Sequence, residues 1–158
     1  MLSISHAATG AFLAAKLQHP LLYIPATLAS HYLEDWVLHW DVGTGLTNGT
    51  RKRTHAFFLE LIDLALAGTI VLWMYPTNPL SAIQHFFTGQ WTGLDPYFGA
   101  FLGLLPDFIE APRNFLRWNP WFLKPFNTFH HAVHNSTPNM LLGLMPQVVV
   151  LAAILWLR

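Results

Sequence analysis

The chain has 158 residues, enough for one domain, and 53% of them are hydrophobic while only 10% are charged. A soluble domain carries about a quarter charged residues, so this deficit predicts an integral membrane protein. The formal net charge is zero, which excludes a nucleic-acid partner held by bulk electrostatics. The absence of cysteine excludes disulfides, thiolate metal ligands and thiol nucleophiles.

The first part of the chain contains two short apolar segments. Residues 7–18 (AATGAFLAAKLQ) predict a helix whose Ala and Gly surface suits close packing, but which is too short to cross a bilayer. His19 and Pro20 end this segment, and residues 21–38 predict a second helix that bends near Pro25. We therefore expect a tight helical hairpin.

The middle of the chain alternates between loops and apolar helices. Residues 40–55 are polar and contain a basic cluster, and residues 76–96 contain several prolines, so both segments are expected to be loops. Between them, residues 56–75 predict a membrane span of about 20 residues. Residues 97–111 predict a shorter apolar helix.

The last part combines an amphipathic segment with a final apolar helix. Residues 112–138 mix basic and aromatic side chains, which predicts a segment lying along a membrane interface. Residues 139–157 predict a last membrane span. The whole pattern predicts an all-α, polytopic membrane protein with about four or five transmembrane or half-membrane helices, forming one domain over residues 1–158.

Three histidines, His130, His131 and His134, lie within five residues of the amphipathic segment. On a helix, His134 shares a face with each of the other two, so either pair can converge on one point. Neutral imidazole is the commonest metal ligand, and a chain without cysteine must build a transition-metal site from nitrogen and oxygen. The alternative is a polar loop that happens to be rich in histidine.

The positions of lysine and arginine orient the predicted helices. The positive-inside rule places Arg51–Arg53, and the segment from Arg113 to Lys124, in the cytoplasm. If successive helices cross the membrane in alternate directions from this starting point, other ionisable residues reach the same membrane face, although they played no part in the assignment. These residues are His6, His31, Asp35, Glu60, Asp63, Asp107, Glu110 and the three clustered histidines.

Their spacing favours a metal over ion pairs. His31 and Asp35 form an H-x-x-x-D pair on one helix face. An ionisable residue in the middle of a membrane helix costs roughly 2.5–3.5 kcal/mol on insertion scales. A bound structural zinc contributes about 10–16 kcal/mol in peptides, enough to offset several such residues. Residues 21–38, 56–75 and 97–111 contain no Lys or Arg that could neutralise the carboxylates instead.

Three motifs occur in a characteristic order. They are Ser5-His6-Ala7-Ala8-Thr9-Gly10, Leu102-Gly103-Leu104-Leu105-Pro106-Asp107 and His130-His131-x-x-His134-Asn135. Together they resemble the predicted membrane-bound metal-dependent hydrolases, a family usually placed with the zinc-dependent phospholipase C and nuclease superfamily. The stretch Ser30-His31-Tyr32-Leu33-Glu34-Asp35, followed by Leu38-His39-Trp40-Asp41, is similar to related small membrane proteins.

The resemblance implies an all-helical site that holds several zinc ions through His and H-x-x-x-D pairs. Two departures are evident. The family's Asp-x-Asp-His reads Asp107-Phe108-Ile109-Glu110 here, and the histidine box lacks its Arg and its final Ser. The predicted ligands of a divalent metal are His6, His31, Asp35, Asp107, His130, His131 and His134. The resemblance implies that this metal is zinc, and the superfamily's pattern implies two or more ions.

Asp107 and Glu110 are the predicted catalytic residues, with Glu110 as a metal ligand or a general base. Each also has a structural explanation, because Asp107 could cap a helix and Glu110 could lie at a solvated helix end. His39 and Asp41 are weaker candidates, since an interface loop flanked by tryptophan explains them.

Three functions fit these observations. The first is a membrane-embedded hydrolase of a phosphoester or lipid-like substrate, acting through metal-activated water at the cytoplasmic face of the cell membrane. The second is a di-iron oxidase or desaturase, because His130-His131-x-x-His134 also resembles a histidine box, although the remaining histidines are scattered singly. The third is a non-catalytic metal-binding membrane protein. The expected partners are membrane lipids and the substrate, without nucleic acid.

Overall fold

The computed structural model describes residues 1–46, 48–76 and 94–158, and the regular structure in these ranges is helical. The predicted all-α class is therefore confirmed. The helices are α1 (Ser3–Leu17), α2 (Pro20–Trp36), α3 (Arg53–Met74), α5 (Asp95–Leu116), α6 (Lys124–Val133) and α7 (Met140–Leu157). Most of the predicted loop at 76–96 lies outside the described residues.

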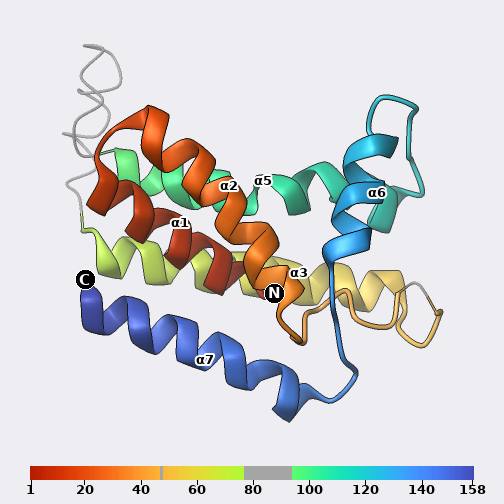
Figure 1. Cartoon of the computed structure of the whole chain (residues 1–158). Coiled ribbons are helices and arrows are strands. Elements are labelled where there is room, and N and C mark those ends of the chain that lie inside the picture. The colour runs from red at the N-terminus through yellow and green to blue at the C-terminus, as the bar shows by residue number, and fades with distance from the viewer. Residues whose placement is uncertain (47, 77–93) are drawn as a thin grey trace.

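Helix α1 lies at the centre of the bundle and contacts α2, α3, α5 and α7. Four alanines of α1 are fully buried, namely Ala7, Ala8, Ala11 and Ala14. Small side chains let neighbouring helix backbones approach closely, so a helix of this composition suits a central position. The expected hairpin of α1 and α2 is present, and α6 crosses steeply at one end of the bundle (Figure 1).

Two glycines of α5 allow the closest of these approaches. A methyl group added at Gly99 would overlap the backbone of Gly10, and one added at Gly103 would overlap the carbonyl of His6. Only a residue without a Cβ fits at such contacts. This approach brings the start of α1 next to the middle of α5.

Helix α5 is longer than predicted. It was expected over residues 97–111, but it continues past Pro106 and Pro112 to Leu116. Each proline removes one backbone hydrogen bond and disfavours an interior position, yet packing against α1 and α2 holds the helix together. In the segment that follows, which was predicted to be amphipathic, the ten residues of α6 are regular helix.

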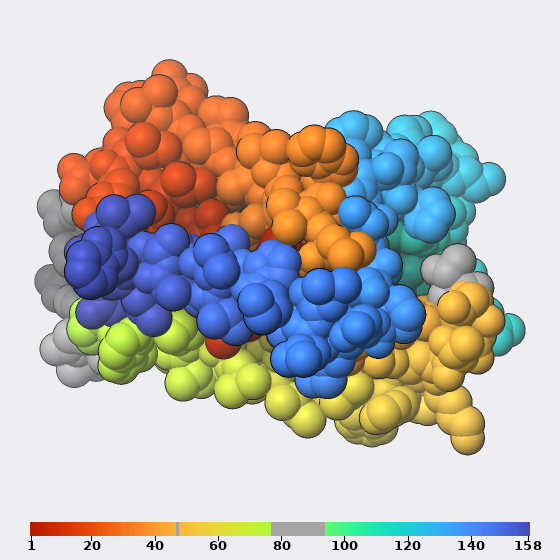
Figure 2. Space-filling model, turned by 60° about the horizontal axis from the view of Figure 1, so that its bottom comes forward, coloured from red at the N-terminus to blue at the C-terminus, as the bar shows by residue number. Residues whose placement is uncertain are grey.

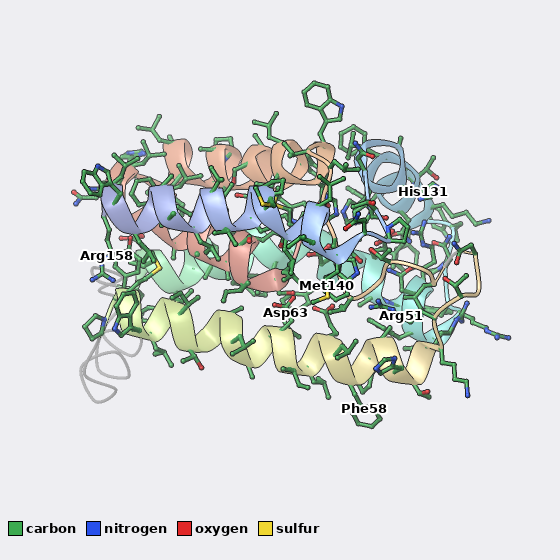
Figure 3. All side chains as sticks on the ribbon, turned by 90° about the horizontal axis from the view of Figure 1, so that it is seen from below. Arg51, Phe58, Asp63, His131, Met140 and Arg158 are labelled. Carbon is green, nitrogen blue, oxygen red and sulfur yellow. The ribbon has the colours of Figure 1, made fainter. Side chains whose placement is uncertain are left out.

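Helices α3 and α7 are long and apolar enough to cross a membrane. Only 22% of the apolar stretch of α3 and 17% of that of α7 are buried inside the protein. Figure 2 shows α7 lying along the surface between the α1–α2 hairpin and α3. Phe58 of α3 points away from the bundle and Asp63 points toward it (Figure 3).

Candidate metal centre

Polar side chains from four helices and two loops meet at one end of the bundle. Four of the largest fully buried side chains in the described chain are polar residues of this region, namely His6, His31, His39 and Asp35. The convergence that the basic residues predicted is therefore present as contacts between segments far apart in the sequence. At its middle is Asp35, near the end of α2.

The first group of possible ligands combines α2, α5 and α6. Nε2 of His31 and Nε2 of His130 are 3.3 Å apart. Asp35 Oδ2 lies 3.4 Å from the first nitrogen and 2.7 Å from the second. Asp107 Oδ1 lies 3.8 Å from both. The four atoms thus surround a single point, and all lie within 4.8 Å of one another.

These separations fit a tetrahedral metal. Bonds of about 2.0–2.2 Å to nitrogen and oxygen place the ligands of tetrahedral zinc about 3.3–3.6 Å apart. The observed distances, from 2.7 to 3.8 Å, bracket that range. The set of two imidazoles and two carboxylates is also one that zinc accepts.

A second group lies on the other side of Asp35. His39 Nε2 is 3.2 Å from His134 Nε2 and 3.7 Å from Asp35 Oδ1. Asp41 Oδ2 lies 3.2 Å from the first imidazole and 3.3 Å from the second. Asp35, His39 and His134 are close enough to share one ion, and Asp41 is placed beside them. The two oxygens of Asp35 therefore face two different groups.

Backbone carbonyls orient two of the imidazoles. Nδ1 of His31 donates to the carbonyl of Gly103 at 2.7 Å, and Nδ1 of His39 donates to that of Val37 at 2.9 Å. A carbonyl only accepts, so Nδ1 carries the proton and each neutral ring has its lone pair on Nε2. Nε2 is the atom that faces the group in both cases. This arrangement is typical of histidines that bind metals.

The loops that carry His39 and His134 are joined by backbone hydrogen bonds. The amide of His39 donates to the carbonyl of Asn135 at 3.1 Å, and the amide of Thr137 donates to the carbonyl of His39 at 2.8 Å. The amide of Asn135 donates to the carbonyl of Asp35 at 2.9 Å. These bonds fix the end of α2 against the end of α6.

His6 lies next to the groups rather than within them. Its ring stacks on His31 with centroids 4.0 Å apart, and its Nε2 is 3.2 Å from Asp35 Oδ1. Its Nδ1 is 2.9 Å from Glu34 Oε2. The amino group of Met1 contacts both His6 Nε2 and Asp35 Oδ1. His6 is fully buried, so it is not an exposed N-terminal residue.

His131 and Glu110, the other two predicted site residues, lie outside both groups. His131 is exposed on α6 and lines the pocket beside the groups without belonging to either of them. Glu110 forms an ion pair with Arg113, and its Oε2 is 3.6 Å from His130 Nδ1. It therefore stands behind the His130 ring, where it can orient that ring.

Burial and neighbouring groups set the protonation of three polar side chains in the loop region. Burial lowers the pKa of His39, which keeps its imidazole neutral at pH 7. Burial opposes ionisation of Asp41, but the hydrogen bond from His134 holds the pKa of this carboxyl well below its usual range. Burial also opposes protonation of His134, yet its contact with Asp41 raises the pKa of the imidazole.

A pocket of about 440 Å³ opens onto the two groups. Its lining includes Asp41, Asp107 and His134 on the side of the groups, together with Glu110 and Arg113. The Asp107 side chain is 31% exposed, whereas that of Asp35 is fully buried. A small molecule in the pocket would reach Asp107, while Asp35 stays behind the imidazoles.

Sequence reasoning gave too little weight to His39. This residue is fully buried and faces His134, rather than belonging to an exposed interface loop. The signal was present, because His31, Asp35 and His39 follow one another at intervals of four residues. The alternative explanation was preferred because a loop flanked by tryptophan accounted for the residue, and the pairing of this loop with residues 135–137 is not visible in the sequence.

Comparison of the chain with family models, with curated proteins and with solved structures gave no match. Assignment of a function therefore depends on the geometry of the site.

Proposed function

We propose that this chain is a membrane-embedded, metal-dependent hydrolase whose site is the pair of groups around Asp35. The observation that supports this proposal best is that Nε2 atoms of four histidines gather around one buried carboxylate. The amino group of Met1 pairs with Asp35 Oδ1, but the facing imidazole nitrogens of the two groups are otherwise left as a costly set of partly satisfied polar groups. A divalent metal in each group would satisfy them.

The membrane location is supported by α3 and α7. A long apolar helix in a soluble protein is mostly buried, whereas these two are mostly exposed. The shorter α1–α2 hairpin and α5 pack against them as membrane or half-membrane helices. Arg51 and the His131 region lie at one end of the bundle and Arg158 at the other (Figure 3). The positive-inside rule then orients the site toward the cytoplasm.

The proposed reaction is hydrolysis of a phosphoester or a related lipid-like substrate. The first group would hold one ion through His31, Asp35, Asp107 and His130, and the second group another through His39, His134 and Asp35. Bound metal would supply Lewis-acid chemistry, activating water and polarising the substrate oxygen at the second group, whose three ligands leave a tetrahedral position open. The phosphoester class follows from the resemblance to membrane-bound hydrolases, and zinc from the same resemblance and from the tetrahedral separations.

Two carboxylates of the chain have complementary positions for this chemistry. Asp107 faces the pocket and can accept a proton from water there. Glu110 pairs with Arg113 and accepts from Asn114 Nδ2 at 3.1 Å, and these contacts hold it behind His130. In this arrangement Glu110 positions the His130 imidazole, and Asp107 accepts the proton from water.

Elemental analysis of the purified protein in neutral detergent tests the metal site. We expect one to two equivalents of zinc per chain, lost together when His31→Ala and His134→Ala are combined. Iron in place of zinc would favour the oxidase alternative, since a carboxylate between imidazoles also suits iron. Absence of metal from the wild-type protein would reject both enzymes.

A hydrolysis screen with phosphomonoesters and phospholipids tests the reaction. Wild-type protein should be active and Asp107→Asn should lose at least about a hundredfold, the lower end of the range for a general acid–base residue. The matched control is Asp95→Asn, a carboxylate that accepts from Tyr23 and lies away from the groups. A metal-loaded protein that is inactive throughout would instead indicate the non-catalytic metal-binding alternative.

A further inference from the structure

A second, smaller pocket adjoins the one at the metal groups. It has a volume of about 300 Å³ and is lined by Leu46, Arg53, Arg113, Asn114 and His131. Four of these residues, all but Arg53, also line the larger pocket, so the two form one continuous hollow. Its outer end is thus basic, whereas its inner end carries the carboxylates of the metal groups.

One cation at the outer end lacks a partner. Nη1 of Arg53 is buried and has no hydrogen-bond partner among the described residues. Arg113, by contrast, pairs with Glu110 and donates from Nη1 to the carbonyl of Asn127 at 3.3 Å. A buried guanidinium N–H without an acceptor is costly, and an anion bound in the hollow would satisfy it.

The hollow also has an apolar wall formed by α3 and α5. Phe57 and Leu61 lie on the first helix, and Phe108 and Phe115 on the second. The rings of Phe57 and Phe115 meet edge to face with centroids 5.5 Å apart. Phe57 is 43% exposed and Phe108 39% exposed, so this wall continues onto the outer, apolar surface of the bundle. An alkyl chain in the hollow could extend from it into lipid.

We propose that the hollow binds an amphiphile with a phosphate-type headgroup and an alkyl chain. Arg53 and His131 bind the headgroup at the basic end, and the wall of Phe57, Leu61 and Phe108 binds the chain. This inference rests on the proposed function, because it names the substrate class of that same site. It makes Arg53 a specificity-determining residue, whereas the charge pattern of the sequence used Arg53 only to orient the helices in the membrane.

Binding of dodecylphosphonate to the full-length, metal-loaded protein in a neutral sugar detergent tests the proposal. The phosphonate cannot be hydrolysed, so the measurement does not depend on turnover. We expect Arg53→Gln to weaken binding about tenfold, as for loss of one charge-assisted hydrogen bond, and Arg53→Lys to restore part of it. The matched control is Lys52→Gln, which removes the adjacent, exposed charge and should leave binding unchanged.

The alkyl wall has its own pair of variants. Phe57→Ala should weaken binding of dodecylphosphonate but not of methylphosphonate, whereas Phe58→Ala should affect neither, because Phe58 is 64% exposed and faces away from the bundle. Equal binding of dodecanol and dodecylphosphonate would show that the hollow does not recognise the headgroup. Equal effects of Lys52→Gln and Arg53→Gln on binding would show that general surface charge, and not a site at Arg53, attracts the phosphonate.

The two proposals fail in different ways. If the wild-type protein binds zinc and hydrolyses phosphoesters while Arg53→Gln binds dodecylphosphonate normally, the substrate inference is wrong and the hydrolase proposal stands. If dodecylphosphonate binds with the expected dependence on Arg53 but no metal or hydrolysis is found, the hollow is a lipid-phosphate site and the hydrolase proposal is wrong.

Discussion

Asp35 is the residue on which the site depends most. Its side chain is fully buried, and its two oxygens face two sets of imidazoles, His31 with His130 and His39 with His134. A buried carboxylate is stable only when it is paired and hydrogen-bonded. A shared carboxylate also ties the two groups together, so a change at Asp35 should affect both.

Asp35→Asn should therefore abolish binding of both metals. The amide keeps the volume of the side chain but offers only one acceptor oxygen and no charge. Loss of a group that hydrogen-bonds to a metal ligand typically lowers metal affinity roughly 10–100-fold. We expect a larger loss here, because Asp35 is itself a proposed ligand. Titration of the purified variant against a chelating dye measures this loss. Retention of two equivalents of zinc at wild-type affinity would contradict the bridging role.

The contact between Asp41 and His134 predicts a pH dependence of metal binding. Because this contact raises the pKa of the His134 imidazole, the ring takes up a proton as the pH falls through that raised value. Metal must displace this proton, whereas Asp41 stays ionised. Affinity at the second group should thus decrease from about pH 8 to about pH 6, by up to roughly tenfold per pH unit. Constant affinity over this range would rule out His134 as a ligand.

At the scale of elements, the site depends on how closely α1 approaches α5. The carbonyl of Gly103 accepts from His31, and the same glycine lies against the backbone of His6. One position thus sets both the separation of the two helices and the orientation of a ligand on a third helix. Packing and metal binding should accordingly respond together when this position changes.

Gly103→Ala should destabilise the protein by about 1–3 kcal/mol, the usual cost of overpacking, and should lower metal content by displacing His31. Gly68→Ala is the matched control, because an added methyl group there meets nothing within 4 Å. That change should be neutral or should stabilise α3 by about 0.4–1 kcal/mol. Thermal unfolding in detergent and elemental analysis distinguish the two variants. Equal stability of both would show that α1 and α5 can separate without cost.

At the scale of the whole molecule, two mostly exposed apolar helices enclose a buried polar site at one end. Exposed side chains such as Leu72 and Trp73 on α3, and Val148 and Val149 on α7, would be unfavourable in water and favourable in lipid. In the proposed membrane placement, the polar site lies near one membrane surface, with the basic residues around its opening.

Single cysteines test this orientation, because the natural chain contains none. Lys52→Cys lies before α3, and Arg158→Cys lies at the end of α7, at opposite ends of the bundle. An impermeant thiol reagent should label the first only in inside-out vesicles and the second only in right-side-out vesicles. Labelling of both variants from the same side would contradict the proposed spans.

The sequence by itself determined the class of fold and the region of the site. Apolar segments of helical length and the scarcity of charge predicted the helices, since backbone hydrogen bonding and hydrophobic periodicity are local properties. The HHAVH cluster, the H-x-x-x-D pair and Asp107 marked most of the residues that meet, because polar side chains in apolar helices need partners.

Only the tertiary structure decided which side chains lie close enough to share an ion. His131 and His130 are neighbours in the sequence, yet one is exposed at the pocket and the other is buried beside Asp35. His39 enters the site because backbone pairing between residues 39 and 135–137 holds its loop inward. Both outcomes depend on contacts between segments roughly a hundred residues apart. Local pattern cannot specify such contacts, because they are set by the packing of α1 against α5 and of α2 against α6.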